Sequence, residues 1–163
     1  MCLTIKKNSR KIAKQDIRVY KVINFDETKP NVWSDPIHSE NDFGFNARLD
    51  ETIPEESSLP VHMESDYLML SEGFFYSFGS MLEAITYLQE LRFRSPESEI
   101  SSYKLCVATI PEGASFYTTK GYYGFDLRFA SFSIIVEKPM ETPTLTKAMD
   151  EDFIYLPTTM SCV

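Results

Sequence analysis

Apolar and polar positions alternate along residues 17–24, which is the pattern of a half-buried strand. The segment reads Ile-Arg-Val-Tyr-Lys-Val-Ile-Asn, and its β-branched and aromatic residues favour extended backbone. Other short apolar and aromatic runs between turn residues predict further strands. These strands are expected at 43–49, 73–78, 103–110, 114–119 and 129–137.

One segment has the periodicity of a helix instead. Ser80 and Glu83 have the spacing of a capping box, in which two side chains satisfy backbone donors at a helix start. One apolar stripe follows at helical spacing, formed by Met81, Ala84, Ile85, Leu88 and Leu91. Because Pro96 disfavours helical backbone just before it, the helix is expected over residues 80–94.

The remaining segments are polar or rich in turn residues. Residues 1–16 are expected to form a basic leader with a short turn of helix, and 25–42 and 50–66 to form loops. Prolines and threonines predict an extended tail over 138–163, with a helical turn near 145–150. The sequence therefore predicts one α+β domain over 1–137, with a mostly antiparallel sheet and one principal helix.

The charge is unevenly distributed along the 163 residues. The net charge is −8, yet residues 1–21 hold seven basic side chains and one acidic one. An acidic body disfavours nucleic acid and anionic membranes as partners. The basic leader could contact a phosphate or an acidic partner, but the favoured interpretation is that it pairs with its own acidic body or stays solvated. The 12 phenylalanines and nine tyrosines exclude intrinsic disorder, and no apolar run approaches membrane-spanning length.

Few residues carry obvious chemistry. The three cysteines, Cys2, Cys106 and Cys162, are widely spaced, and there are two histidines. This pattern disfavours a zinc site and a disulfide framework and favours the reducing cytoplasm, with no secretory leader. The nucleophile-elbow, P-loop, dinucleotide-binding and zinc-protease motifs are all absent. No metal and no cofactor are therefore expected.

Aromatic side chains are densest between residues 116 and 132. They are Phe116, Tyr117, Tyr122, Tyr123, Phe125, Phe129 and Phe132. Packing in the core is the favoured interpretation. The alternative is an aromatic wall that stacks on a planar ligand or anchors a protein partner. For that alternative, the candidate contact residues are Tyr117, Tyr122, Tyr123 and Arg128.

Four further segments stand out as a set. They are Met-Cys-Leu-Thr-Ile-Lys-Lys with Asp-Ile-Arg-Val-Tyr-Lys-Val near the start, Gly73 to Phe78, Ile110 to Tyr117, and Ala130 to Val136. Together they resemble a family of small uncharacterised proteins from bacteriophages and gut bacteria. The resemblance covers residues 1–137 and implies a bacteriophage origin without an assigned activity.

The chain also has a strand with Arg18 and Tyr20, then Gly-Phe-x-x-Ser before a helix carrying Ala84, then a strand ending in a Pro-x-Gly turn. This order of elements is, more weakly, similar to the ADP-ribosyltransferase layout. In such enzymes an early arginine and a strand serine hold NAD, and a late glutamate stabilises the developing positive charge. The resemblance implies Arg18, Ser77 and Glu137 for these roles.

Three function classes follow. A non-enzymatic binding or accessory protein, phage-encoded and recognising a host protein or a small nucleotide-like ligand, is favoured. The alternatives are a degenerate or active NAD-dependent ADP-ribosyltransferase-like protein, and a virion component that assembles through its tail. An enzyme is the less favoured class, no membrane partner is expected, and self-association stays open.

Overall fold

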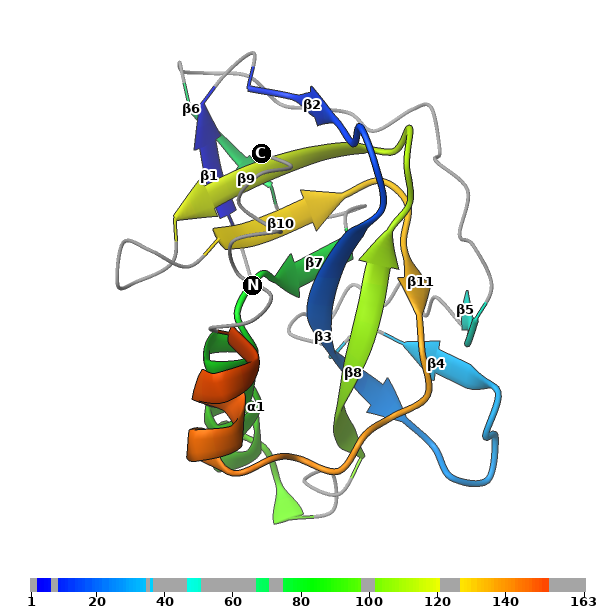
Figure 1. The fold of residues 1–163 in the computed structure, drawn as a ribbon. Coiled ribbons are helices and arrows are strands. Elements are labelled where there is room, and N and C mark those ends of the chain that lie inside the picture. The colour runs from blue at the N-terminus through cyan, green and yellow to red at the C-terminus, as the bar shows by residue number, and fades with distance from the viewer. Residues whose placement is uncertain are drawn as a thin grey trace.

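The computed structural model describes residues 3–6, 9–34, 36, 47–50, 67–70, 75–97, 102–120 and 127–152 (Figure 1). The strands are β1 (Leu3–Lys6), β2 (Lys11–Ile12), β3 (Ile17–Phe25), β4 (Val32–Ser34), β5 (Ala47–Arg48), β6 (Tyr67–Leu70), β7 (Phe75–Phe78), β8 (Tyr103–Ile110), β9 (Ser115–Lys120), β10 (Leu127–Ser131) and β11 (Ile135–Val136). The principal helix is α1 (Met81–Arg94), and residues 145–152 form a second, shorter helix. The predicted α+β class is confirmed.

The main sheet is antiparallel and consists of two parts. Its strand order is β11-β8-β3-β7-β10-β9-β2; in addition, β4 pairs with the end of β3, and β5 pairs with β4. β3 and β8 pair along their whole length, from Ile17 opposite Ile110 to Asn24 opposite Tyr103. β3 and β7 meet at one residue pair only, Tyr20 opposite Phe78. The strands β7, β10 and β9 therefore cross the direction of β3 and β8 at a steep angle, as Figure 1 shows.

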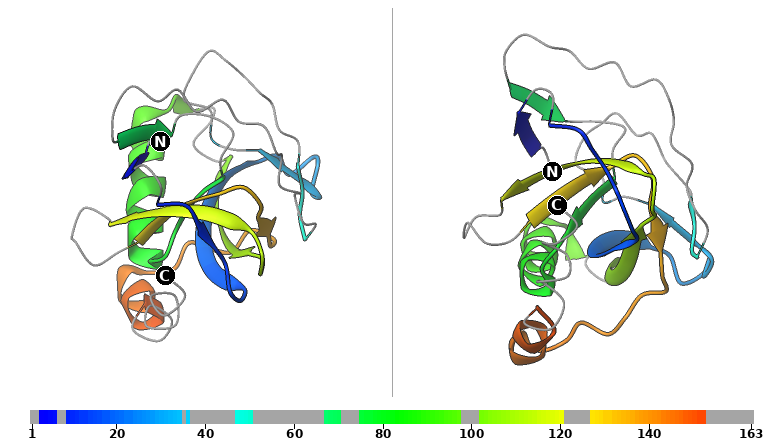
Figure 2. Two further views of the ribbon diagram at one scale, coloured as in Figure 1. Left: turned by 90° about the horizontal axis from the view of Figure 1, so that it is seen from above. Right: turned by 45° about the horizontal axis from the view of Figure 1, so that its top comes forward.

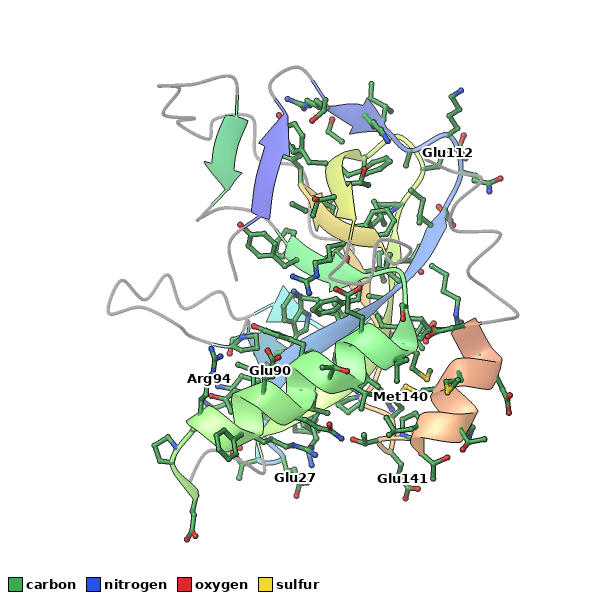
Figure 3. All side chains as sticks on the ribbon, turned by 90° about the vertical axis from the view of Figure 1, so that its left-hand side faces the viewer. Glu27, Glu90, Arg94, Glu112, Met140 and Glu141 are labelled. Carbon is green, nitrogen blue, oxygen red and sulfur yellow. The ribbon has the colours of Figure 1, made fainter. Side chains whose placement is uncertain are left out.

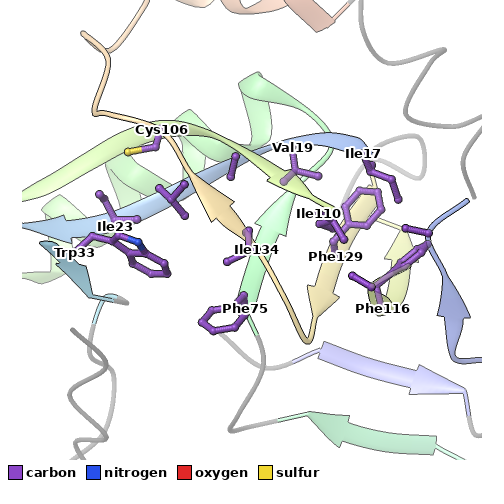
Figure 4. Packing of buried hydrophobic residues seen from close by; sticks show 14 of the residues in the cluster. Ile17, Val19, Ile23, Trp33, Phe75, Cys106, Ile110, Phe116, Phe129 and Ile134 are labelled. Carbon is purple, nitrogen blue, oxygen red and sulfur yellow. The ribbon is translucent and has the colours of Figure 1, made fainter. Parts of the chain in front are cut away.

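The first core lies between these two parts of the sheet (Figure 4). Alternation along β3 directs Ile17, Val19 and Ile23 to this face. They meet Phe116 of β9 and Phe129 of β10, whose ring centroids lie 5.8 Å apart. The described aromatic residues of the 116–132 cluster are therefore buried, which favours the core interpretation for them.

The second core lies on the opposite face of β3 and β8, beneath α1. Tyr20 and Val22 point to this face because they alternate with the residues of the first core. The stripe predicted from the sequence packs against them, and all five of its residues are buried. The C-terminal segment joins this core through Ala148, and it lies beside α1 in both views of Figure 2.

Several expected boundaries agree with the structure and three segments differ. The helix expected at 80–94 spans Met81–Arg94 with Ser80 as its N-cap, and the strand expected at 103–110 is β8. The helical turn expected in the leader is wrong for its described residues, because Leu3–Lys6 pairs with β6 and Lys11–Ile12 with β9. Pairing across the sheet outweighs the local preference.

The loop expected at 25–42 contains a strand. β4 folds back on β3 through the loop of residues 26–31, so that Trp33 lies opposite Phe25 and is buried. The single strand expected at 129–137 is two strands. β10 pairs with β7 and β9, whereas β11 pairs with β8, on the far side of β3. The chain therefore leaves one part of the sheet after β10 and joins the other part at β11. Most of 43–49 and nearly all of 50–66 lie outside the described residues.

Residues 138–152 run along the second core. Residues 141–144 are not in a regular element, and the Met140 amide donates to the Leu105 carbonyl at 2.9 Å. The expected helical turn near 145–150 is present and extends to residue 152. Residues 153–163 lie outside the described part, and the domain boundary expected after residue 137 stays a prediction. Among the described helices, none has the length and apolarity needed to cross a membrane.

Candidate functional site

The start of α1 is a point where several polar side chains meet. The first backbone N–H groups of a helix have no partner within the helix and need acceptors from outside it. Ser80 has extended backbone, and its hydroxyl oxygen accepts a hydrogen bond from the Glu83 amide at 3.2 Å. This is the first of the two hydrogen bonds of the predicted capping box, in which the N-cap side chain accepts from a backbone amide of the first turn.

The other early donors of α1 bind a carboxylate from the C-terminal segment. Asp152 accepts from the Met81 amide at 2.5 Å, from the Leu82 amide at 3.1 Å and from the Ser80 hydroxyl at 2.8 Å. Figure 3 shows segment 145–152 beside this end of α1, with Arg94 at the opposite end. A helix N-terminus favours negative charge, so the carboxylate occupies a position suited to an anion.

An ion pair links this helix turn to the sheet. The Arg128 Nε group on β10 donates to Glu83 Oε1, and their side chains are 20% and 6% exposed. The Arg128 guanidinium also lies 5.8 Å from the centroid of the Phe78 ring. The Glu83 carboxylate thus binds an arginine of the sheet, beyond the role that the capping-box pattern predicted.

Arg18 and Tyr20 of β3 lie on the same face, next to the C-terminal carboxylates. The Arg18 guanidinium is 5.7 Å from the centroid of the Tyr20 ring. Tyr20 is 1% exposed, and the Arg18 side chain is the hydrogen-bonding group beside its hydroxyl. Burial raises the pKa of Tyr20, the nearby Arg18 opposes this shift, and the charges of Glu151 and Asp152 add to it.

We name this group the α1 N-terminal site. It consists of Arg18, Tyr20, Ser80, Glu83 and Arg128, with Glu151 and Asp152 contributed by segment 145–152. Two arginines face three carboxylates in it. Two of those three carboxylates belong to the C-terminal segment, so the rest of the site holds two arginines and one carboxylate.

The three residues suggested by the transferase resemblance are not brought together. Arg18 lies on the face of β3 that α1 covers, whereas Ser77 is fully buried on the other face of the sheet, opposite Phe129. Glu137 is exposed just after β11, which β8 separates from β3. The structure offers these three side chains no common site.

The residues proposed for ligand or partner contact have separate positions. Tyr117 is buried, with its ring centroid 6.1 Å from that of Phe132, so it belongs to the packing of β9. Arg128 belongs to the α1 N-terminal site. Tyr122 and Tyr123 lie outside the described residues.

One buried lysine, Lys21, was not predicted from the sequence. Lys21 is 1% exposed, its Nζ donates to the Tyr76 carbonyl at 2.8 Å, and it lies 5.4 Å from the centroid of the Trp33 ring. The signal was present, because Lys21 falls in the inward register of Val19 and Ile23 on β3. A polar residue at a core position of a strand is informative.

Cys106 stands opposite Lys21 on β8 and is fully buried. Burial raises the pKa of its thiol to about 12, against a smaller opposing effect of Lys21. Because the thiolate is the reactive form, this thiol is not a nucleophile near neutral pH. The pair is therefore part of the core packing between β3 and β8.

Comparison with protein-family models, curated proteins and solved structures found no match for this chain. Within the described residues, histidine, cysteine, aspartate and glutamate side chains nowhere gather in threes as a metal-binding set. The α1 N-terminal site, with its concentrated donors and charges, is thus the strongest candidate that the described residues present.

Proposed function

We propose that this protein is a non-catalytic binding protein that receives the phosphate of a small nucleotide-like ligand at the α1 N-terminal site. One observation carries the proposal. Three donors, the Ser80 hydroxyl and the amides of Met81 and Leu82, converge on a single carboxylate. Phosphate oxygens accept from the same set of donors at helix N-termini.

The surroundings of these donors support an anionic ligand. Arg18 and Arg128 approach from two different strands, β3 and β10, and guanidinium groups are well suited to phosphate. The Tyr20 hydroxyl, which lies beside Arg18, adds a buried polar group next to these cations.

The same features favour binding over catalysis. An ADP-ribosyltransferase would need Arg18, Ser77 and Glu137 around one ligand, and they lie on different faces and strands. A host protein as partner and a virion role remain alternatives from the sequence alone. The resemblance to phage proteins supports a phage-encoded protein that acts in the host cytoplasm.

The test is a titration of the isotope-labelled full chain, followed by amide resonances. Three probes are compared: AMP, inorganic phosphate and adenosine. We expect AMP and phosphate to shift the amide signals of Met81 and Leu82, and adenosine to leave them in place. The variant Arg18→Gln should weaken AMP binding. Lys104→Gln, which removes a cation paired with Glu27 elsewhere on the molecule, should not.

Two results would contradict the proposal. Adenosine that binds as well as AMP would show that the phosphate is not recognised. Equal AMP affinity of wild type and Arg18→Gln would show that the α1 N-terminal site does not hold the phosphate.

A further inference from the structure

Three polar side chains are buried in one region of the first core, on the face of β3 opposite to α1. Lys21 and Trp33 are 1% exposed, and Ser77 is fully buried. The Nζ of Lys21 donates to the carbonyl of Tyr76, the residue immediately before Ser77, at 2.8 Å. The same Nζ lies 5.4 Å from the centroid of the Trp33 ring. The three side chains therefore reach this region from three strands, β3, β4 and β7.

Two of these side chains carry a polar atom without a hydrogen-bond partner among the described residues. They are the Nε1 of the Trp33 indole and the hydroxyl oxygen of Ser77. Buried polar groups are nearly always paired with protein or with a bound molecule, because an unpaired one loses its hydrogen bonds to water without replacement. The indole N–H can only donate, so the partner that Trp33 needs is an acceptor.

A second serine on the same face shows how such a group is normally paired. Ser131 of β10 stands opposite Phe75 of β7, two places along the ladder from the pair of Ser77 and Phe129. Ser131 is equally buried, but its hydroxyl donates to the Phe75 carbonyl at 3.4 Å. Ser77 makes no such bond within the part of the chain that the structure describes, so its burial beside Lys21 needs a separate explanation.

The surroundings determine which acceptor fits. The Lys21 ammonium brings a positive charge among apolar side chains, where a negatively charged acceptor is attracted more strongly than in water. Trp33 packs on Phe75, with ring centroids 6.1 Å apart, at one end of the first core (Figure 4). Close packing leaves room for a small group only, and a doubly charged phosphate is costly to bury there. A carboxylate, with one charge and two acceptor oxygens, suits these donors.

The strand that carries Trp33 provides the route of entry. β4 pairs with β3 through two residue pairs and with β5 through two more. By contrast, β3 and β8 are paired along their whole length, from Ile17 to Asn24. Short ladders at the margin of a sheet open at lower free energy than long central ones, so opening of β4 admits a small solute to Lys21.

We propose that the first core holds a binding site for a small monocarboxylate, formed by the Trp33 Nε1 group, the Ser77 hydroxyl and the Lys21 ammonium. The indole and the hydroxyl donate to the carboxylate, and the lysine supplies the charge that favours it over a neutral acceptor. The site lies on the other face of β3 from the α1 N-terminal site and does not depend on the phosphate proposed there.

The indole N–H of Trp33 is the probe for the test. Trp33 is the single tryptophan of the chain, so its side-chain resonance is unambiguous in the isotope-labelled protein. Sodium acetate is titrated into the full chain. The comparison solutes are acetamide, which has the size of acetate without the charge, and sodium chloride at the same ionic strength.

We expect acetate to shift the indole resonance in a saturable way and to slow its hydrogen exchange, because the N–H gains an acceptor. Acetamide and sodium chloride should leave both unchanged. Lys21→Met, which keeps most of the side-chain volume, should weaken acetate binding by about tenfold or more, since a hydrogen bond to a charged group is lost. Ser77→Ala should weaken it about fivefold. Ser131→Ala, the matched control, should bind acetate as wild type does.

Three results would overturn the proposal. An indole resonance of the wild-type protein that shows no saturable change with acetate would mean that no carboxylate binds beside Trp33. An equal change with acetamide or chloride would mean that the site does not recognise a carboxylate. Equal losses of affinity in Ser77→Ala and Ser131→Ala would mean that acetate binding responds only to a general loosening of the core. The first two comparisons use the wild-type chain, so they decide the question even if Lys21→Met does not fold.

Discussion

Arg128 of β10 and Glu83 of α1 form an ion pair that joins the second part of the sheet to the first turn of the helix. Both side chains are largely shielded from solvent. The pair also fixes the end of α1 at which Ser80 and Asp152 meet. It therefore contributes both to stability and to the shape of the candidate site.

Replacing Arg128 should destabilise the fold. Arg128→Met leaves the Glu83 carboxylate without this partner, and breaking a largely buried pair costs roughly 2–3 kcal/mol after allowance for its partial exposure. Urea unfolding measures the loss. Lys104→Met is the matched control, because Lys104 lies 3.9 Å from Glu27, whose side chain is 82% exposed. That pair should contribute less than about 0.5 kcal/mol, and equal losses in the two variants would contradict the assignment.

Removing the N-cap of α1 should have a smaller effect. Ser80→Ala removes the acceptor of the Glu83 amide and the donor to Asp152, which predicts a loss of about 1 kcal/mol. Thermal unfolding at one fixed pH is the measurement. Thr86→Ala serves as control, because the Thr86 hydroxyl only donates to the Leu82 carbonyl on the exposed side of the helix. If both variants unfold at the same temperature, Ser80 does not cap the helix.

Lys21 gives a prediction that separates volume from hydrogen bonding. Lys21→Ala should lose about 3 kcal/mol, because truncation of a core side chain leaves a cavity. Lys21→Met keeps most of the volume and removes the hydrogen bond to the Tyr76 carbonyl, so it should lose only about 1–2 kcal/mol. Chemical denaturation of the two variants gives the order. A wild-type stability for Lys21→Ala would show that this position is not part of the core.

The buried thiol predicts alkaline destabilisation. The pKa of Cys106 rises from an ordinary value of 9.0 to about 12 in the fold, so the folded protein keeps a proton that the unfolded chain releases. Unfolding is then coupled to proton loss, and stability falls as the pH rises from about 9 towards 12. Urea titrations over this pH range should show a shallower fall for Cys106→Ala. An identical slope in the two proteins would contradict the raised pKa.

Patterns among neighbouring residues predicted the helices and strands whose conformation depends mainly on those neighbours. The stripe from Met81 to Leu91, with Ser80 before it and Pro96 after it, located α1 within one residue. The alternation along 17–24 located β3 and the two faces that its residues serve. Lys21 could have been recognised in the same way, by its place among inward-facing residues.

The α1 N-terminal site depends on contacts between residues far apart in the sequence, which no local pattern predicts. Asp152 stands in an acidic run that looks like a solvated surface, and its role comes from α1 lying beside it in space. Arg128 and Glu83 meet because β10 crosses beneath the first turn of the helix. Likewise, residues 129–137 look like one strand, and only the placement of β8 and β9 explains why the chain divides there.

The attachment of Asp152 to the start of α1 also has a consequence for the newly made chain. The ribosome must add 72 residues after Ser80 before the carboxylate that binds this turn exists. At usual translation speeds this interval lasts on the order of several seconds. During this interval, water satisfies the Met81 and Leu82 amides in the absence of the Asp152 carboxylate. The full capping of this turn therefore follows the synthesis of segment 145–152.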